Sequence, residues 1–155
     1  MGFNLLRKHS GAIREGILHT NKKELLTPCF VLATRSGSVP FITPDMLDLR
    51  EPMGAVSFTG IDFVHMPGLT AFEDNKVDAS SFLCLGNNPL VLSLRDPYTY
   101  NISSVTKQGI ALLHRSGKQV IDAKLLQRML DIFQPDIAIL PAAEVPWYAS
   151  NKQWS

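Results

Sequence analysis

The stretch DAKLLQRMLDIFQPDIAIL, residues 122–140, is the strongest fold signal in this chain. Asp122 is a favourable helix N-cap and Pro135 ends a helix, so the stretch predicts an amphipathic helix over 122–134. The apolar side chains at helical spacing are Leu125, Leu126, Met129, Leu130 and Phe133. An apolar run of strand length, 137–140, follows almost at once and predicts a buried strand. A helix joined by a short turn to a fully apolar strand favours α/β packing with parallel strands.

Residues 141–155 follow this predicted strand and are too few for a covering helix. Because a parallel strand is normally covered on both faces, we expect residues 1–155 to be the N-terminal part of one larger domain, present here as a fragment or a short isoform. The predicted fold class is α/β. An antiparallel N-terminal β-ribbon would be followed by the first units of an α/β barrel or open sheet.

The remaining elements are shorter and are separated by turn residues. The expected strands are the apolar runs at 3–8, 12–19, 29–34, 55–59, 90–94, 109–113 and 118–121. Thr43-Pro44-Asp45 has the form of a helix start, with a capping residue followed by proline. Proline and glycine interrupt the pattern over 61–88, where we expect only a short helix at 77–84.

Composition limits the functional classes. Apolar residues make up 45% of the chain and the formal charge is +1, so no overall field favours nucleic acid or a membrane. Residues 1–35 hold six Lys/Arg against two acids, which we interpret as solvated charge on an edge hairpin rather than a phosphate site. Cys29 and Cys84 lie in apolar surroundings and are expected to be reduced core residues. No apolar run approaches the ~20 residues of a membrane span, so a cytosolic protein is expected.

Two carboxylates are placed where α/β proteins carry chemistry. Asp96 follows the predicted strand at 90–94, and Glu144 follows the one at 137–140. One hypothesis is therefore an independent small α/β enzyme that uses this pair as acid and base. The alternative for Asp96 is a simple Asp-Pro turn. His65 and His114 have no acid or cysteine at ligand-like spacing, so no metal site is predicted there.

Motifs in the first fifty residues resemble the tRNA-guanine transglycosylase family, in the family's order. GAIREGILHT at residues 11–20 fits Gly-x-x-Arg-x-Gly-x-Leu-x-Thr, and Thr27-Pro28-Cys29-Phe30 fits Thr-Pro-x-Phe. Thr34, Gly37 and Val39 are similar to the next turn, and 43–47 to the helix start after it. The resemblance implies a modified (β/α)8 barrel of TIM type and exchange of a tRNA guanine for a deazaguanine base. It also implies that the nucleophilic aspartate and the Cys/Cys/Cys/His zinc ligands lie beyond residue 155, so no cofactor is expected within this chain.

Two sites depart from the catalytic members of that family. After the strand corresponding to 90–94, those members carry Asp-Ser-Gly-Gly-Phe-Gln, whereas this chain carries Asp96-Pro97-Tyr98-Thr99. Pro97 lacks an N–H and has a fixed φ where a base would have to approach. After 137–140 the base-reading aspartate of the family falls on Ala142, and Glu144 is two positions out of register. Loss of a polar partner for a buried base edge removes discrimination.

These departures, with Asp96-Pro97 and Gln134-Pro135-Asp136, resemble the non-catalytic accessory branch of the eukaryotic family. The resemblance implies no catalytic residue and no metal in this chain, with Asp96 and Glu144 as weak substrate-binding candidates. The implied partner is the catalytic queuine tRNA-ribosyltransferase subunit in a heterodimer, with tRNA contacted indirectly during queuosine formation. The implied location is the cytoplasm, peripheral to the mitochondrial outer membrane.

Overall fold

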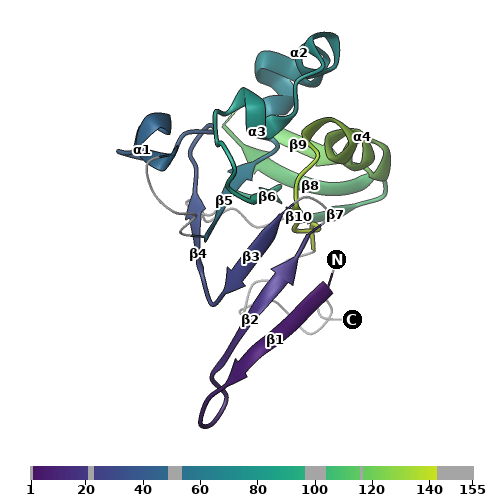
Figure 1. Ribbon diagram of the computed structural model, residues 1–155. Coiled ribbons are helices and arrows are strands. Elements are labelled where there is room, and N and C mark those ends of the chain that lie inside the picture. Colours follow the sequence, from purple (N-terminus) through teal and green to yellow (C-terminus); the bar gives the residue numbers. More distant parts are fainter. Residues whose placement is uncertain (1, 21–22, 49–53, 97–103, 116, 143–155) are drawn as a thin grey trace.

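The computed structural model describes residues 2–20, 23–48, 54–96, 104–115 and 117–142 (Figure 1). These residues form a mixed α/β structure with three β-sheets. The strands are β1 (Gly2–Lys8), β2 (Arg14–His19), β3 (Glu24–Thr27), β4 (Phe30–Ala33), β5 (Gly54–Thr59), β6 (Leu90–Ser93), β7 (Ser104–Thr106), β8 (Gly109–His114), β9 (Gly117–Ile121) and β10 (Ile137–Ala138). The helices are α1 (Pro44–Asp48), α2 (Leu69–Asn75), α3 (Ala79–Phe82) and α4 (Ala123–Phe133). The segment η1 (Val64–Gly68) precedes α2 and is kinked, because Met66 has extended backbone angles.

A parallel sheet of β4, β5, β6 and β10 forms the centre of the structure. The four strands lie side by side in the order β4, β5, β6, β10. All three pairings between neighbouring strands are parallel. Val56 pairs with Leu32 on one side and with Leu90 on the other, so these three side chains share a face. The parallel strands predicted from the helix–turn–strand pattern are therefore confirmed.

Helices cover that face of the parallel sheet and build the main core (Figure 1). Phe133 of α4 packs edge-on against Phe58 of β5, with ring centroids 5.3 Å apart and an interplanar angle of 84°. Phe72 of α2 makes a similar contact with Phe133, also at 5.3 Å. Such pairs contribute about 0.5–1.5 kcal/mol beyond the burial of their area. Aromatic packing thus joins α2 and α4 to the sheet.

Helix α4 confirms the helix predicted over 122–134. The Asp122 carboxylate accepts a hydrogen bond from the backbone N–H of Leu125 at 2.7 Å, which caps the first turn. Met129 and Phe133 are fully buried, whereas the polar side chains on the opposite face are exposed. Gln134, in the left-handed conformation at φ 46°, ends the helix just before Pro135.

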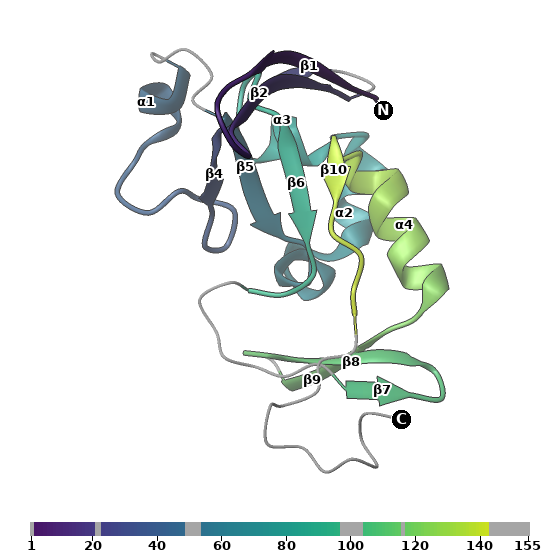
Figure 2. The ribbon, with the colours of Figure 1, turned by 90° about the horizontal axis from the view of Figure 1, so that it is seen from below.

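The two antiparallel sheets lie at opposite ends of the parallel strands (Figure 2). The sheet of β1, β2 and β3 crosses the amino ends, where Leu25 packs on Ala55 and Val91. A carboxylate fixes this sheet in place, because Asp136 accepts hydrogen bonds from Thr20 Oγ1 at 2.8 Å and from the Leu90 N–H at 2.9 Å. The sheet of β7, β8 and β9 lies at the carboxyl ends, beside the loops that follow β5 and β6.

Several predicted elements differ from the structure. Strands β3 and β7 were not predicted, and the stretch 61–88 holds η1 and α2 in addition to α3. The predicted strand 137–140 is shorter, because β10 ends at Ala138. Its predicted burial is wrong, since Ile139 and Leu140 are 55% and 66% exposed. Among the described residues β10 has only β6 as a neighbour, so these side chains lie at a sheet edge.

The two cysteines are free thiols, as predicted, but only one lies near the core. Cys29 is half-buried and packs against the cluster that contains Leu25. Cys84 is exposed and has a left-handed φ of 53°. The expectation of a core position is therefore wrong for Cys84, because the turn after α3 places its side chain in solvent.

Candidate functional site

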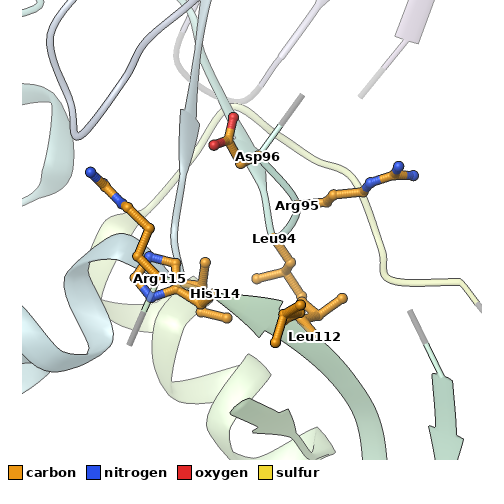
Figure 3. Close-up of a pocket in the computed structure, with 8 residues that line it drawn as sticks. Leu94, Arg95, Asp96, Leu112, His114 and Arg115 are labelled. Atoms are coloured by element: carbon orange, nitrogen blue, oxygen red, sulfur yellow. The ribbon is translucent and has the colours of Figure 1, made fainter. Parts of the chain in front are cut away.

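A small hollow lies where the carboxyl ends of β5 and β6 meet the β8–β9 hairpin (Figure 3). Its volume is about 160 Å³. The lining residues are Ile61, Leu94, Arg95, Asp96, Leu112, Leu113, His114 and Arg115. Ligand sites of α/β folds gather at this end of parallel strands. Sites for small organic ligands usually measure roughly 300–1,000 Å³, so this hollow by itself suits only a small group.

Asp96 reaches the hollow through a bend that ends β6. Ser93 Oγ donates a hydrogen bond to the Arg95 carbonyl oxygen at 2.8 Å and accepts one from the Arg95 N–H at 3.3 Å. This local bonding by a serine hydroxyl is a common way to turn the chain. Asp96 is half-buried, and Figure 3 shows its carboxylate above the hollow, between Arg95 on one side and Arg115 on the other. Asp96 thus follows a bend and also lines the site.

The other half of the predicted acid–base pair, Glu144, lies outside the described residues. Pro97, Tyr98 and Thr99 also lie outside the described residues. They stand where catalytic members of the tRNA-guanine transglycosylase family, which this chain resembles, carry the glycine motif. An Asp96–Glu144 pair therefore stays a prediction. Ala142 is described and is exposed near the end of β10, where the resemblance places a base-reading aspartate.

A polar network that the sequence did not predict joins three loops beside the hollow. His114 Nε2 lies 2.7 Å from Asp62 Oδ1, and because a carboxylate only accepts, this nitrogen carries the hydrogen. Arg115 Nη2 lies 3.6 Å from the same oxygen and donates to Ser36 Oγ at 2.7 Å. The network connects the loop after β4, the loop after β5 and the end of β8. It fixes the hairpin over the carboxyl ends of the strands.

Burial divides this network into an inner and an outer half. The side chains of Asp62 and His114 are only 11% and 13% exposed. Arg115 is 61% exposed although two contacts hold it. A shielded carboxylate–imidazole pair thus supports an exposed guanidinium.

Sequence spacing gave no direct sign of these contacts. Asp62 and His114 are 52 residues apart, and Ser36 and Arg115 are 79 apart. One usable signal was that Asp62 follows the strand β5 as Asp96 follows β6, both at carboxyl ends. The prediction that His114 has no acid at ligand-like spacing concerned neighbours in sequence, and the fold supplies one from another loop.

The other histidines pair within their own surroundings. His19 of β2 lies 3.0 Å from Glu24 Oε1 of β3 and 3.0 Å from Asn4 Nδ2 of β1, so it bridges the N-terminal sheet. His65 Nε2 lies 2.9 Å from Gln119 Oε1. Across the described ranges, no three His, Cys, Asp or Glu side chains gather closely enough to hold a metal ion.

Within the residues that the structure describes, no helix combines the length and the apolar character needed to cross a bilayer.

Comparison with protein-family models gives no match for this chain. Among curated proteins, this chain is similar to several that are named queuine tRNA-ribosyltransferase accessory subunit 2. The protein of that name from Ixodes scapularis is 29% identical over 140 residues, which cover 86% of this chain and 34% of that protein. The Trichoplax adhaerens protein is 24% identical over 146 residues, covering 90% of this chain and 38% of its own length. The Drosophila erecta protein is 25% identical over 137 residues, covering 85% and 33%.

The chain therefore spans about a third of the length of the curated relatives it matches. The aligned residues nevertheless include most of this chain. These similarities confirm the resemblance predicted from the motifs, which is to the accessory subunits of queuine tRNA-ribosyltransferase.

Proposed function

We propose that this chain acts in a non-catalytic accessory subunit of a queuine tRNA-ribosyltransferase, supporting the exchange of guanine for queuine in tRNA. The observation that carries the proposal is the similarity, over 80–90% of the chain, to four proteins of that name. Because the chain spans about a third of those proteins, the activity and the partners are proposed for the whole protein. The proposed partner is the catalytic subunit, in a heterodimer that contacts tRNA.

The residues at the carboxyl ends of the strands support a non-catalytic role. After β6, Asp96 is followed by Pro97 instead of the glycines that would let a base approach the backbone. After β10, Ala142 stands where a base-reading aspartate is expected. A methyl group makes no hydrogen bond, and a buried polar edge left unpaired costs about 1–3 kcal/mol. A guanine would thus lose a specific partner at this position.

The strand order supports a barrel as the proposed fold of the whole domain. Strands β4, β5, β6 and β10 lie in the sheet in the same order as in the chain, and the separate sheet of β7, β8 and β9 is inserted between β6 and β10. This is the order of a (β/α)8 barrel, whereas a doubly wound sheet reverses its order at a switch point. We therefore propose that residues 1–155 supply the opening units of a single TIM-type barrel domain.

The location and the metal content follow from the same resemblance and remain proposals. We place the protein in the cytoplasm, peripheral to the mitochondrial outer membrane. The described residues offer no zinc ligand set, so no chemistry is assigned to a metal in this part of the chain.

The test of the partnership is size-exclusion chromatography with light scattering on the full-length protein, the catalytic subunit and their mixture. We expect the mixture to elute as a heterodimer that binds tRNA more tightly than either subunit alone. Separate elution of the two subunits at micromolar concentration would overturn the proposed partnership.

The alternative of an independent enzyme predicts a different behaviour. It requires Asp96 and Glu144 to act together, and it needs no partner subunit for stability or activity. Cooperative unfolding of the isolated protein together with an Asp96-dependent activity would favour that alternative. If a heterodimer that carries Asp96→Asn binds tRNA and exchanges guanine like the wild type, that result would count against the independent enzyme.

A further inference from the structure

We propose that Arg115 is a contact for an RNA phosphate group, held ready by Ser36 and Asp62 at the carboxyl edge of the parallel sheet. This inference rests on the proposed function, because RNA is the anionic partner which that function supplies. It names one residue through which the accessory subunit would touch tRNA directly.

Arg115 is an exposed arginine whose side chain is held by two contacts. Its Nη2 atom makes both contacts of the side chain, to Ser36 Oγ at 2.7 Å and near Asp62 Oδ1 at 3.6 Å. A guanidinium has five N–H donors in a planar fork. The donors on Nε and Nη1 have no partner among the described residues, and the side chain is 61% exposed. The free part of the fork therefore remains available to a ligand.

The shape of this free donor set fits a phosphate. Two parallel N–H groups of arginine match two oxygens of a phosphate, which a lysine ammonium does not. Holding the side chain in advance also reduces the rotamer freedom lost on binding. Ser36 lies in a loop that two backbone hydrogen bonds between Arg35 and Ser38, of 2.8 and 3.1 Å, hold closed.

The charges near Arg115 favour an anion on its outer side. Asp62 is shielded, because it is 11% exposed and accepts a hydrogen bond from His114 at 2.7 Å. The Arg115 side chain is 61% exposed, so the phosphate would approach from the solvent side. Arg35, next to Ser36, and Lys118, on the same hairpin, are exposed cations that make no ion pair within the described part of the chain.

An RNA backbone fits these observations better than a lipid surface. Recognition of anionic lipids by exposed cations usually takes a cluster of ~4–8 Lys/Arg. Here one preorganised fork is accompanied by two exposed cations, Arg35 and Lys118, which is fewer than such a cluster. A phosphate contact of this kind positions RNA without reading its sequence.

The test measures tRNA binding by the heterodimer of full-length protein and catalytic subunit over a series of salt concentrations. Arg115→Ala should weaken binding about tenfold, as expected for loss of a charge-assisted contact. It should also reduce the slope of log K against log salt by roughly 0.7–0.9. Arg115→Lys and Ser36→Ala should keep the slope and weaken binding about threefold, because the charge stays and the ordered fork is lost. The matched control is Lys124→Ala, which removes an exposed cation from α4.

Three outcomes would overturn the inference. Binding and slope equal in Arg115→Ala and Lys124→Ala would remove Arg115 from the interface. Unchanged tRNA binding with loss of binding to anionic vesicles in Arg115→Ala would assign the contact to lipid. A wild-type heterodimer that forms but does not bind tRNA would refute RNA as the partner, whereas failure of the heterodimer to form would refute the proposed function itself. Should Arg115→Ala fold poorly in thermal melts, Arg115→Lys and Ser36→Ala still decide the question.

Discussion

The hydrogen bonds of Asp136 give the most direct prediction about how the N-terminal sheet is held. The carboxylate accepts from Thr20 Oγ1 at 2.8 Å and from the Leu90 N–H at 2.9 Å, and its own N–H donates to the Leu90 carbonyl at 2.9 Å. Asp136→Ala removes both carboxylate contacts and leaves the backbone one. The N–H of Leu90, a residue of β6 whose side chain is fully buried, then lacks its acceptor.

The expected loss follows from these two contacts. An unpaired buried N–H costs about 1–3 kcal/mol, and the hydrogen bond from Thr20 to a charged acceptor contributes about 1.5–3 kcal/mol. Allowing for partial access of water, we expect Asp136→Ala to lower the free energy of unfolding by about 3 kcal/mol. Asp136→Asn keeps one acceptor oxygen and should lose about half as much. Domains are stable by only about 5–15 kcal/mol, so the effect is large.

The assay is urea unfolding of the full-length protein followed by circular dichroism. Asp131→Ala is the matched control, because Asp131 is exposed on α4 and, among the described residues, its side chain accepts only one hydrogen bond, from Gln127 at 2.9 Å. That control should change the stability by less than about 0.5 kcal/mol. Equal midpoints for Asp136→Ala and Asp131→Ala would refute the reasoning that this carboxylate fixes the ribbon to the sheet.

Three further predictions use the core, the surface and the site. Met129→Ala should lower the free energy of unfolding by about 2–5 kcal/mol, since the side chain is completely buried, and an unchanged urea midpoint would show that the core is not packed as described. The hydrogen bond from Arg128 lowers the pKa of Glu73, so this pair stabilises the fold above the unfolded-state pKa of Glu73 and the effect is lost as pH falls through the lower folded-state pKa; Glu73→Gln should flatten stability against pH in that acidic range, and parallel profiles would contradict this. Asp96→Asn should leave guanine exchange by the heterodimer within about twofold of wild type, whereas a loss of about a hundredfold or more would make Asp96 a catalytic residue.

Local signals in the sequence were enough for the elements that depend on neighbours in the chain. Helix α4 was predicted together with its cap at Asp122, because a capping residue, an apolar stripe and a terminating proline lie within one short stretch. Strands β5 and β6 were predicted from apolar runs bounded by turns. Strands β3 and β7, of four and three residues, are too short to show a periodic pattern and form because a neighbouring strand pairs with them.

The candidate site was only partly predictable for the same physical reason. Asp96 was found because a carboxylate after an apolar strand is a local signal. The contacts of Asp62 with His114 and of Ser36 with Arg115 join residues 52 and 79 positions apart, and only the packing of the hairpin on the strand ends brings them together. The predicted burial of Leu140 was wrong because an apolar run shows that a strand can be covered, and not which strands cover it.

The division of labour between the subunits is tested most directly by the initial rate at which radiolabelled guanine enters tRNA. The rate is measured for the full-length protein alone, for the catalytic subunit alone and for an equimolar mixture. We expect no incorporation by this protein alone and a higher rate for the mixture than for the catalytic subunit alone. Incorporation by this protein without its partner, abolished by Asp96→Asn, would show that it is an enzyme and not an accessory subunit.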